Sequence, residues 1–253
     1  MIQSHRSISV FFPAYNDEGT IAQLVQESLA LLPRLSSDYE VIIVDDGSTD
    51  RTSMIADELT RDSPFVRAVH HARNAGYGSA LRSGFGHASK ELIFYTDGDG
   101  QYDIRELALL CERMTDDIDV VNGYKLKRAD TAARRVIGAI YNQLAHLLFH
   151  LPVRDVDCDF RLIRRECIKE IELGSSSGAI CVEIVSKLQR AGCRFAEVGV
   201  HHLSRVHGRS QFFTPRRIIA TAFDLVALRF GLMIRRSFTV GRQPCHDEDV
   251  SGK

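Results

Sequence analysis

The sequence predicts an α/β fold in which helices cover both faces of a mostly parallel sheet. Two observations lead to this prediction. The strand-like segments are continuous apolar runs, which is typical of strands buried on both faces. They alternate with segments whose apolar residues recur at helical spacing, as in successive β-α-β units. A chain of 253 residues, 44% of them hydrophobic, is long enough to form one large domain with its own core.

The elements of the N-terminal half follow in chain order. The run 8–16 predicts a strand that Pro13 breaks, and 20–35 predicts a helix with Thr20 as its N-cap. The remaining strands of this half are expected in 39–50, 65–71 and 90–100, and the remaining helices at 54–62 and 79–89.

Three acidic turns follow these strands: PAYNDE at 13–18, DDGSTD at 45–50 and DGDGQYD at 97–103. In open α/β sheets the ligand lies beyond the carboxyl ends of the strands, where such turns project. Loops rich in carboxylates and amides are unusual for direct contact with phosphate, and a metal ion supplies the positive charge that they lack. The GxGxxG motif of nicotinamide-binding domains is absent after the first strand, which disfavours that class.

The DGDGQYD turn predicts a metal site. Asp97 and Asp99 have the same side-chain parity on an extended segment, and Gln101 continues that parity. Hard oxygen ligands at an open edge suit Mg²⁺ or Mn²⁺, which keep coordination positions for phosphate oxygens. The alternative is a solvated acidic turn, because Asp and Gly favour turns without any ligand.

Charge and cysteine usage restrict the partners and the compartment. The net charge of -1 provides no global field to attract nucleic acid, so an anionic partner must meet a local basic cluster. The six cysteines form no CxxC pair, which favours reduced thiols in a cytosolic protein. The N-terminus enters a strand too early for a signal peptide. We therefore expect the cytoplasm, or the cytoplasmic face of a membrane.

Four motifs, PAYNDE, VDDGSTD, NAGYGSALRSGF and DGDGQ, resemble in order and spacing those of the family 2 glycosyltransferases with the GT-A fold. Two later segments, RDVDCDFRLIRRE and EVGVHHLSRVHGRSQFF, are similar to those of the polyprenyl-phosphate glycosyltransferases, the group of dolichol-phosphate mannose synthase. The resemblance covers residues 7–215. It implies a nucleotide-sugar donor (GDP-mannose or a UDP-hexose), a polyprenyl (dolichyl or undecaprenyl) phosphate acceptor, and Mg²⁺ or Mn²⁺ as cofactor.

The resemblance also implies roles for individual residues. Asp45 resembles the carboxylate that accepts from a base N–H, and Arg205 resembles the group that closes over the nucleotide phosphates. Gln211 stands where the family often has Lys. The alternatives are a packing role for Tyr15, a turn role for Asp45 and Asp46, and a solvated charge for Arg205. The implied nucleotide-binding residues are Pro13, Tyr15, Asp17, Asp45, Asp46, Gly98, Asp99 and Gln211, the implied metal ligands are Asp97, Asp99 and Gln101, and the implied catalytic residues are Asp97, Asp99, Asp157 and Arg205.

The acceptor phosphate is expected to meet a basic cluster of Arg128, Arg134 and Arg135, because guanidinium groups match phosphate geometry. A solvated helix face is the alternative for each of them. The family often has Ser-Arg a few residues before an Asn in this region, whereas this chain has GAIYN at 138–142.

The chemistry depends on the acceptor. A lipid phosphate is already anionic near neutral pH, so the enzyme has to align two anions rather than provide a strong base. The family resemblance implies inversion at the anomeric carbon. A saccharide hydroxyl would need a general base, for which Asp157 is the leading candidate. The available carboxylates are Asp155, Asp157, Asp159 and Glu183. A transferase for a saccharide or another non-lipid acceptor, and a degenerate relative that binds a nucleotide sugar without turnover, are the two other functions that the sequence allows.

Two apolar segments are candidates for a membrane surface. The segment 218–234 contains Asp224 and Arg229 and is flanked by further arginines, which predicts an amphipathic helix on an anionic leaflet. The segment 136–153 is the second candidate, and core or dimer-interface helices are the alternative. We therefore divide the chain into a catalytic domain at 1–215, an amphipathic helix at 216–240 and a polar tail at 241–253 that we expect to be disordered. The sequence makes no prediction of oligomeric state.

Overall fold

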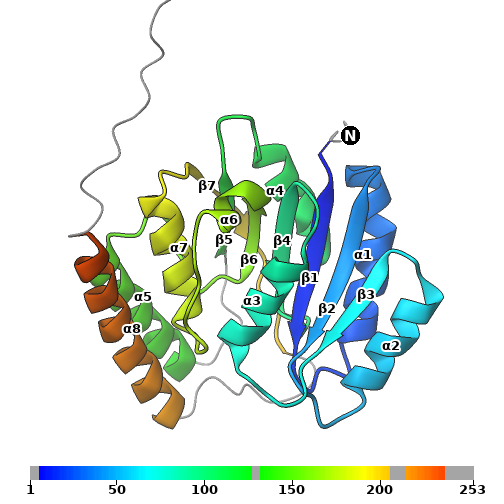
Figure 1. Ribbon diagram of the computed structural model, residues 1–253, viewed down its shortest axis with the longest axis horizontal. Helices are drawn as coiled ribbons and strands as arrows, with labels where there is room; N and C mark the ends of the chain where they lie inside the picture. The colour runs from blue at the N-terminus through cyan, green and yellow to red at the C-terminus, as the bar shows by residue number, and fades with distance from the viewer. Residues whose placement is uncertain (1–5, 127–131, 206–214, 237–253) are drawn as a thin grey trace, which may run out of the picture.

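A seven-stranded sheet with the order β3-β2-β1-β4-β6-β5-β7 forms the centre of the computed structural model (Figure 1), which describes residues 6–126, 132–205 and 215–236. Its strands are β1 (Ile8–Ala14), β2 (Tyr39–Asp45), β3 (Val66–His70), β4 (Leu92–Thr96), β5 (Val120–Lys125), β6 (Phe160–Arg164) and β7 (Phe195–Val200). Strand β6 is antiparallel to its neighbours β4 and β5, and the other neighbouring strands are parallel. The predicted α/β class with a mostly parallel sheet is confirmed.

Helices cover both faces of the sheet. One face packs against α1, α2 and α4, and the opposite face packs against α3, α6 and α7. The helices are α1 (Ile21–Leu35), α2 (Thr52–Asp62), α3 (Tyr77–His87), α4 (Leu107–Arg113), α5 (Ala132–Phe149), α6 (Arg165–Lys169), α7 (Ile180–Arg190) and α8 (Pro215–Arg236), with the short 3₁₀ helix η1 (Ile104–Glu106) before α4.

The side chains of the central strands alternate between these two faces. In β1, Val10 and Phe12 belong to the core beneath α1 and α4, whereas Phe11 packs edge-on against Phe85 of α3, with ring centroids 5.1 Å apart. Because both faces are buried, the strands are continuous apolar runs in the sequence.

Helices α5 and α8 lie next to each other at one edge of the molecule, beyond α7 (Figure 1). They form a third apolar core with α7, in which Phe149, Val182 and Leu225 are buried. Asp224, the acidic residue of α8, accepts a hydrogen bond from the Ser177 hydroxyl at 2.5 Å. One side of each of these two helices is therefore packed against the rest of the domain. The predicted tail at 241–253 lies outside the described residues.

Two local expectations about the first turn have different outcomes. Thr20 is the N-cap residue of α1, as predicted, but its side chain makes no capping hydrogen bond, and its hydroxyl donates to the carbonyl of Gly98 at 2.6 Å. Pro13 does not break the first strand, because β1 continues to Ala14 and Pro13 stays in register with Val44 of β2. Both residues instead hold the turn after β4, since the Pro13 carbonyl accepts from the Gly98 N–H at 3.1 Å.

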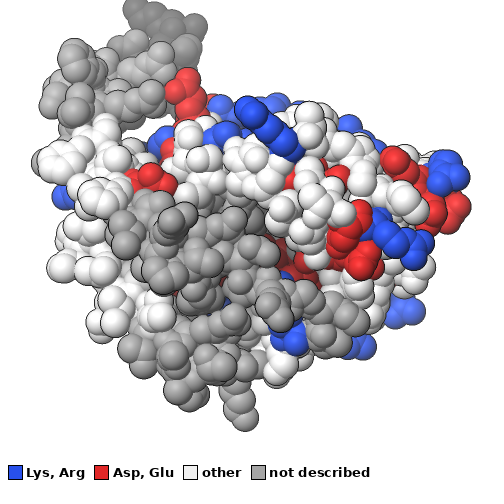
Figure 2. All heavy atoms as spheres, turned by 90° about the horizontal axis from the view of Figure 1, so that it is seen from below, with Lys and Arg blue, Asp and Glu red and all other residues white. Residues whose placement is uncertain are grey.

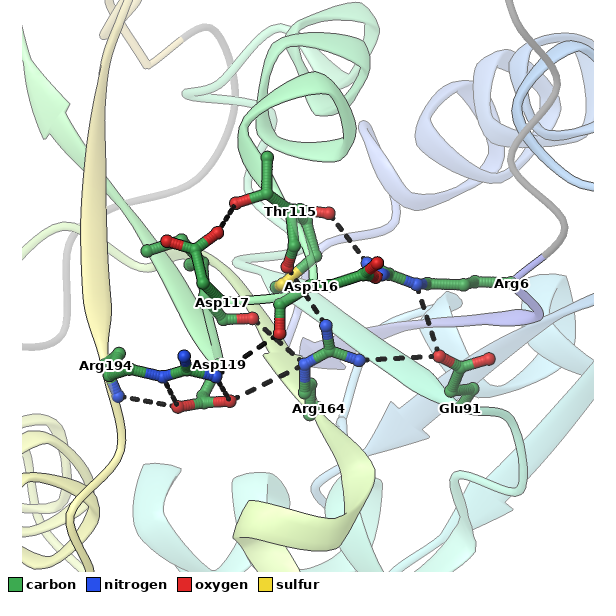
Figure 3. Close-up of polar contacts among 10 residues, drawn as sticks. Arg6, Glu91, Thr115, Asp116, Asp117, Asp119, Arg164 and Arg194 are labelled. Carbon is green, nitrogen blue, oxygen red and sulfur yellow. Dashed lines mark hydrogen bonds and ion pairs between the residues drawn. The ribbon is translucent and has the colours of Figure 1, made fainter.

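The amino-terminal ends of the parallel strands carry a network of paired charges (Figure 3). Glu91 contacts Arg6 at 3.4 Å and Arg164 at 3.5 Å. Asp119 contacts Arg164 at 3.7 Å and Arg194 at 3.2 Å, and it also accepts from the backbone N–H of Arg194. Three arginines from distant parts of the chain therefore neutralise the carboxylates at this end of the sheet.

Candidate active site

The turns after β1 and β2 are hydrogen-bonded to each other at the carboxyl end of the sheet. The N–H of Asn16 donates to the Ser48 hydroxyl at 3.0 Å, and the Asn16 side chain accepts from the N–H of Thr49 at 2.8 Å. The N–H of Asp17 donates to the Thr52 hydroxyl at 2.9 Å. The polar residues of PAYNDE and DDGSTD are therefore partners that fix one shared surface.

Gly98 lets the turn after β4 approach the turn after β1. A Cβ atom at this position would lie 3.0 Å from the Pro13 carbonyl oxygen and 3.2 Å from Oδ2 of Asp17. A larger residue would push the two turns apart. The structure thus brings together Pro13, Asp17, Gly98 and Asp99, four members of the predicted nucleotide-binding set.

Asp17 lies among other acids with little compensation. Its carboxylate accepts from the Tyr15 N–H at 2.9 Å. Burial raises the pKa of Asp17 to about 7; the hydrogen bond from Tyr15 and the charge of Arg205 lower it, and the charge of Asp99 raises it further.

Asp97 has the same electrostatic character. Burial raises its pKa well above the usual value, and the carboxylates of Asp159 and Asp99 raise it further. The Tyr77 hydroxyl donates to Oδ1 of Asp97 at 2.7 Å and partly offsets this effect. A group of acids that repel one another in this way favours a bound cation.

Asp99 has a cation as its partner. It accepts from the Gln101 N–H at 3.0 Å and forms an ion pair with the Arg205 guanidinium, whose side chain is 22% exposed. Nε of Arg205 is buried and has no hydrogen-bond partner among the residues that the structure describes. The guanidinium group therefore contacts one of the three predicted metal ligands, while its Nε–H makes no hydrogen bond to the described residues.

The donor set fits a divalent cation of the Mg²⁺ or Mn²⁺ type. Asp97 and Asp99 offer hard carboxylate oxygens, and the acids around them lack compensating charge. Within residues 6–126, 132–205 and 215–236, no group of three or more His, Cys, Asp and Glu side chains is arranged as a complete metal site. Mg²⁺ is commonly held by one or two carboxylates and completed by water and substrate phosphates, and Asp97 and Asp99 offer such carboxylates.

Gln101, the third predicted ligand, connects the DGDGQYD turn to the segment after β7. The side-chain amide of Gln101 donates to the Leu203 carbonyl at 3.1 Å, and the backbone carbonyl of Gln101 accepts from the Leu203 N–H at 2.7 Å. The isolated bridge between Tyr102 and His202 extends this connection. Gln101 thereby helps to place Arg205, and its role as a metal ligand remains a prediction.

Asp45 and Asp46, at the end of β2, already have protein partners. Asp45 accepts from the Ser48 N–H at 3.0 Å and contacts Nδ1 of His70 at 3.0 Å. Burial raises the pKa of Asp45, but the hydrogen bonds from Ser48 and His70 outweigh it and leave the pKa below its usual value. Asp46 accepts from the N–H groups of Ala75 and Gly76, both at 2.9 Å. Asp46 thus holds the NAGYG loop. Nucleotide binding by Asp45 and Asp46 remains a prediction.

The acidic segment before β6 is built around a buried arginine. Arg161 is fully buried and donates to Asn122 at 2.5 Å, to the Tyr95 hydroxyl and to the Val156 carbonyl at 3.3 Å. It therefore ties β4, β5 and the 156–159 turn together. This contact network gives a physical reason for the FRL motif that the sequence contains at 160–162.

Asp159, rather than Asp157, is the acid of this segment that acts on Asp97. Asp159 is buried, accepts from the Cys181 thiol at 3.1 Å and raises the pKa of Asp97. Asp157 is more exposed and lies 3.6 Å from the Lys125 ammonium. Asp159 lies two residues after Asp157 and so has the same side-chain parity before the strand. This spacing is the signal in the sequence that Asp159 could face the site as Asp157 was predicted to do.

Glu183, one of the carboxylates considered as a general base, has a structural role. It accepts from the N–H groups of Gly174 at 2.9 Å and Ser175 at 2.8 Å, and from Lys187 at 2.6 Å. Its oxygens are thus committed to the loop that precedes α7.

Several predicted residues cannot be placed in the site. Arg128 and Gln211 lie outside the described residues, and the structure describes the backbone but not the side chains of Arg134 and Arg135 in α5. The assignment of the acceptor phosphate to these arginines therefore remains a prediction.

Comparison with solved structures defines the class of protein. Glucosyl-3-phosphoglycerate synthase from Mycobacterium tuberculosis, in complex with Mn²⁺, UDP-glucose and phosphoglyceric acid, superposes with a TM-score of 0.70 at 19% identity, over 89% of this chain and 80% of that one. The same enzyme with Mg²⁺ and UDP gives a TM-score of 0.64 at 18% identity, over 88% and 80% of the two chains. The fold is therefore that of a GT-A glycosyltransferase.

Sequence comparison defines the family. The model of glycosyl transferase family 2 matches residues 9–172. The undecaprenyl-phosphate 4-deoxy-4-formamido-L-arabinose transferase of Enterobacter sp. (strain 638) is 28% identical over 226 residues, which is 89% of this chain and 68% of the relative. The enzyme of that name from Edwardsiella ictaluri (strain 93-146) is 30% identical over 220 residues, 87% and 66% of the two chains. This chain belongs to glycosyl transferase family 2 and is a glycosyltransferase, as the sequence motifs predict.

Proposed function

We propose that this enzyme transfers a sugar from a nucleotide diphosphate sugar, either GDP-mannose or a UDP-hexose, to a polyprenyl phosphate at the cytoplasmic face of a membrane. The observation that carries the proposal is the acidic group at the carboxyl ends of β1 and β4, where burial and neighbouring carboxylates raise the pKa values of Asp17 and Asp97, and where the nearby Asp99 pairs with Arg205. The polyprenyl-phosphate acceptor is supported by relatives named as undecaprenyl-phosphate transferases.

The acidic site requires a cation if a diphosphate is to bind there. Asp97 and Asp99 would hold Mg²⁺ or Mn²⁺, which when bound neutralises charge on the departing nucleoside diphosphate as a Lewis acid. Arg205 is the second cationic group of the site and already contacts Asp99. We expect Arg205 to move its unused Nε–H toward a phosphate oxygen, because that donor is buried without a partner.

The transfer itself needs alignment more than acid–base chemistry. An oxygen of the acceptor phosphate forms a bond to the anomeric carbon, while the bond from that carbon to the nucleoside diphosphate breaks and its electron pair leaves with the diphosphate. Attack from the opposite side gives inversion. An anionic phosphate oxygen needs no general base. We therefore expect Asp157 and Asp159 to position the sugar and the acceptor and not to remove a proton.

The exposed sides of α5 and α8 provide a surface for the lipid. Ile137, Ile140, Leu144 and Leu147 form one stripe at helical spacing on α5, and Leu147 is 73% exposed. Phe223, Val226 and Phe230 form a second stripe on α8, with Phe223 69% exposed. Such a patch on a folded domain marks an interaction surface. No helix within the described residues is long and apolar enough to span a bilayer.

The arrangement of this surface fits a lipid boundary. Seen from below, the described atoms on the side of the molecule where α5 and α8 lie are mostly white, which marks residues other than Lys, Arg, Asp and Glu, whereas blue and red spheres gather on the opposite side (Figure 2). Since the opposite sides of α5 and α8 are packed on α7, the exposed stripes are available to contact acyl chains while the helices stay folded.

The transferase activity can be tested directly. Purified protein with Mn²⁺ or Mg²⁺ is incubated with radiolabelled GDP-mannose and a panel of UDP-hexoses, with polyprenyl phosphate, with a soluble saccharide, or with no acceptor. We expect label to enter the lipid phase with one donor and only with polyprenyl phosphate present. Transfer to the saccharide in the absence of lipid would overturn the acceptor assignment and restore the need for a general base.

The membrane surface has a separate test. The double variant Leu147→Glu/Phe230→Glu places two charges on the apolar stripes, and Met54→Glu places one on α2, where Met54 is 53% exposed. Flotation with vesicles that contain anionic lipid should show at least a tenfold loss of binding for the double variant, because each buried apolar side chain is worth about 1.5–3 kcal/mol. Binding of the double variant equal to that of Met54→Glu would contradict the proposed surface.

A further inference from the structure

We infer that Tyr77 is a positioning residue that orients Asp97 toward the divalent cation, an inference that rests on the proposed function. The Tyr77 hydroxyl donates to Oδ1 of Asp97 at 2.7 Å. Within the residues that the structure describes, it is the one hydrogen-bond donor to this carboxylate, and it leaves Oδ2 for a metal. Asp99, in contrast, is fixed by a backbone N–H and by Arg205. Outer hydrogen bonds of this kind orient metal ligands and tune their affinity.

The backbone of Tyr77 is held from the side of β2. Asp46 accepts from the N–H groups of Ala75 and Gly76, so the end of β2 fixes the loop immediately before Tyr77. Gly76 has a φ of 94°, in the region that favours glycine, and this conformation turns the chain into α3 at Tyr77.

The same backbone is held from the other side by the segment before α7. The Gly78 N–H donates to the Ser176 carbonyl at 3.0 Å. A Cβ atom on Gly76 would lie 2.6 Å from the Ser176 carbonyl oxygen, and one on Gly78 would lie 2.2 Å from that of Ser175. Two glycines therefore admit the close contact that places the ring of Tyr77, which gives the NAGYG motif a structural role in this chain.

The ring and the hydroxyl of Tyr77 have separable functions. The ring packs at the edge of the apolar core formed by α3, α7 and the sheet. The hydroxyl is the donor in the 2.7 Å hydrogen bond to Oδ1 of Asp97. Replacing Tyr77 by Phe removes the donor to Asp97 and keeps the packing.

The test compares Tyr77→Phe with Tyr39→Phe, which makes the same chemical change where Tyr39 stacks on Phe65 away from the acidic site, at a centroid distance of 4.7 Å. Mn²⁺ binding is measured from the electron paramagnetic resonance signal of free Mn²⁺, in the presence of GDP or UDP. We expect Tyr77→Phe to weaken Mn²⁺ binding about tenfold, as outer-shell substitutions commonly do. Tyr39→Phe should bind as the wild type does. The thermal unfolding temperature without metal should stay the same in all three proteins.

A positioning role also predicts a split in the kinetics. Tyr77→Phe should need about tenfold more Mn²⁺ for half-maximal transfer and recover most of the wild-type kcat once Mn²⁺ is saturating. Mn²⁺ affinity of Tyr77→Phe within twofold of the wild type would overturn the inference and leave the proposed function standing. Absence of Mn²⁺ binding by the wild type would overturn the cation-dependent part of the proposed function and this inference with it.

A second pair of variants serves if Tyr77→Phe unfolds. Tyr77→His, which keeps a ring and a donor, must then bind Mn²⁺ more tightly than Tyr77→Leu, and equal affinities would overturn the inference.

Discussion

The two ends of the sheet treat their acidic residues in opposite ways. At the amino end, Asp119 is held by Arg194 and Arg164; burial raises its pKa, but these hydrogen bonds and charges outweigh that effect and leave the pKa below its usual value (Figure 3). At the carboxyl end, burial and neighbouring acids raise the pKa values of Asp17 and Asp97. A protein gains stability from the first arrangement and loses it in the second. The comparison locates the site at the end where stability is given up for binding.

The division is not uniform across the carboxyl end. On the β2 side, Asp45 and Asp46 have His70 and His71 as partners together with backbone N–H groups. The poorly compensated acids are those near β1, β4 and β6. This difference supports our proposal that the cation binds between those strands and that the nucleoside binds on the β2 side.

The strongest test of the comparison exchanges one carboxylate at each end for an amide. Asp99→Asn should lower transfer by on the order of a thousandfold or more, because a cation at the leaving group stabilises the transition state by several kcal/mol. Asp119→Asn should retain transfer within a few fold. Initial rates under saturating donor and acceptor measure both. Equal losses in the two variants would remove the functional distinction between the ends.

Two arginines of β6 sharpen the comparison. Arg161 supports the carboxyl end from a fully buried position, whereas Arg164 belongs to the amino-end network. Arg161→Met should destabilise the fold by about 3–5 kcal/mol. The reason is that Asn122, the Tyr95 hydroxyl and the Val156 carbonyl would lose their buried hydrogen-bond donor. Arg164→Met should cost about 1–2 kcal/mol, the scale of a few partly exposed charged hydrogen bonds. Urea unfolding at neutral pH gives both values, and a larger cost for Arg164→Met would contradict the hydrogen-bond assignment of Arg161.

The smallest expected effect concerns pH. Because the folded state lowers the pKa of Asp119, its contribution is present above the unfolded pKa of about 3.9 and is lost as the pH falls through the lower folded value. Asp119→Asn should therefore reduce the free energy of unfolding by about 1–2 kcal/mol at pH 7. The difference from the wild type should shrink at pH 3. Urea unfolding of both proteins at the two pH values measures this change, and a difference that grows toward acid would reverse the sign of the argument.

Much of the fold and part of the site follow from local sequence patterns. The apolar runs predict the strands, and the acidic turn is predicted at the carboxyl end of β4, but the parity argument for Asp97 and Asp99 does not apply, because β4 ends at Thr96 and the chain turns after it. Alternation of strand and helix predicts the parallel core. The antiparallel position of β6 between β4 and β5 is not visible locally, because it depends on which strand edges are free after the first half has folded.

The remaining site residues depend on contacts between distant segments. Tyr77 meets Asp97 only because α3 begins at the edge where β4 ends, and Asp159 acts on Asp97 only because β6 pairs with β4. Thr20 has the residue type and position of an N-cap, but its hydroxyl donates to the Gly98 carbonyl and accepts no hydrogen bond from the first turn of α1. Local propensity is overruled in each case by a partner that the sequence pattern does not identify.

The central claim, that the acids at the carboxyl end form the cation site, is tested most directly by thermal unfolding of the wild type, Asp97→Asn and Asp119→Asn with and without Mn²⁺ and nucleoside diphosphate. A ligand at one hundred times its Kd stabilises the folded state by about 2.7 kcal/mol, which corresponds to a rise of roughly 5–10 °C for a chain of this size. We predict this rise for the wild type and Asp119→Asn and its loss in Asp97→Asn. A rise in Asp97→Asn equal to that of the wild type would contradict the assignment.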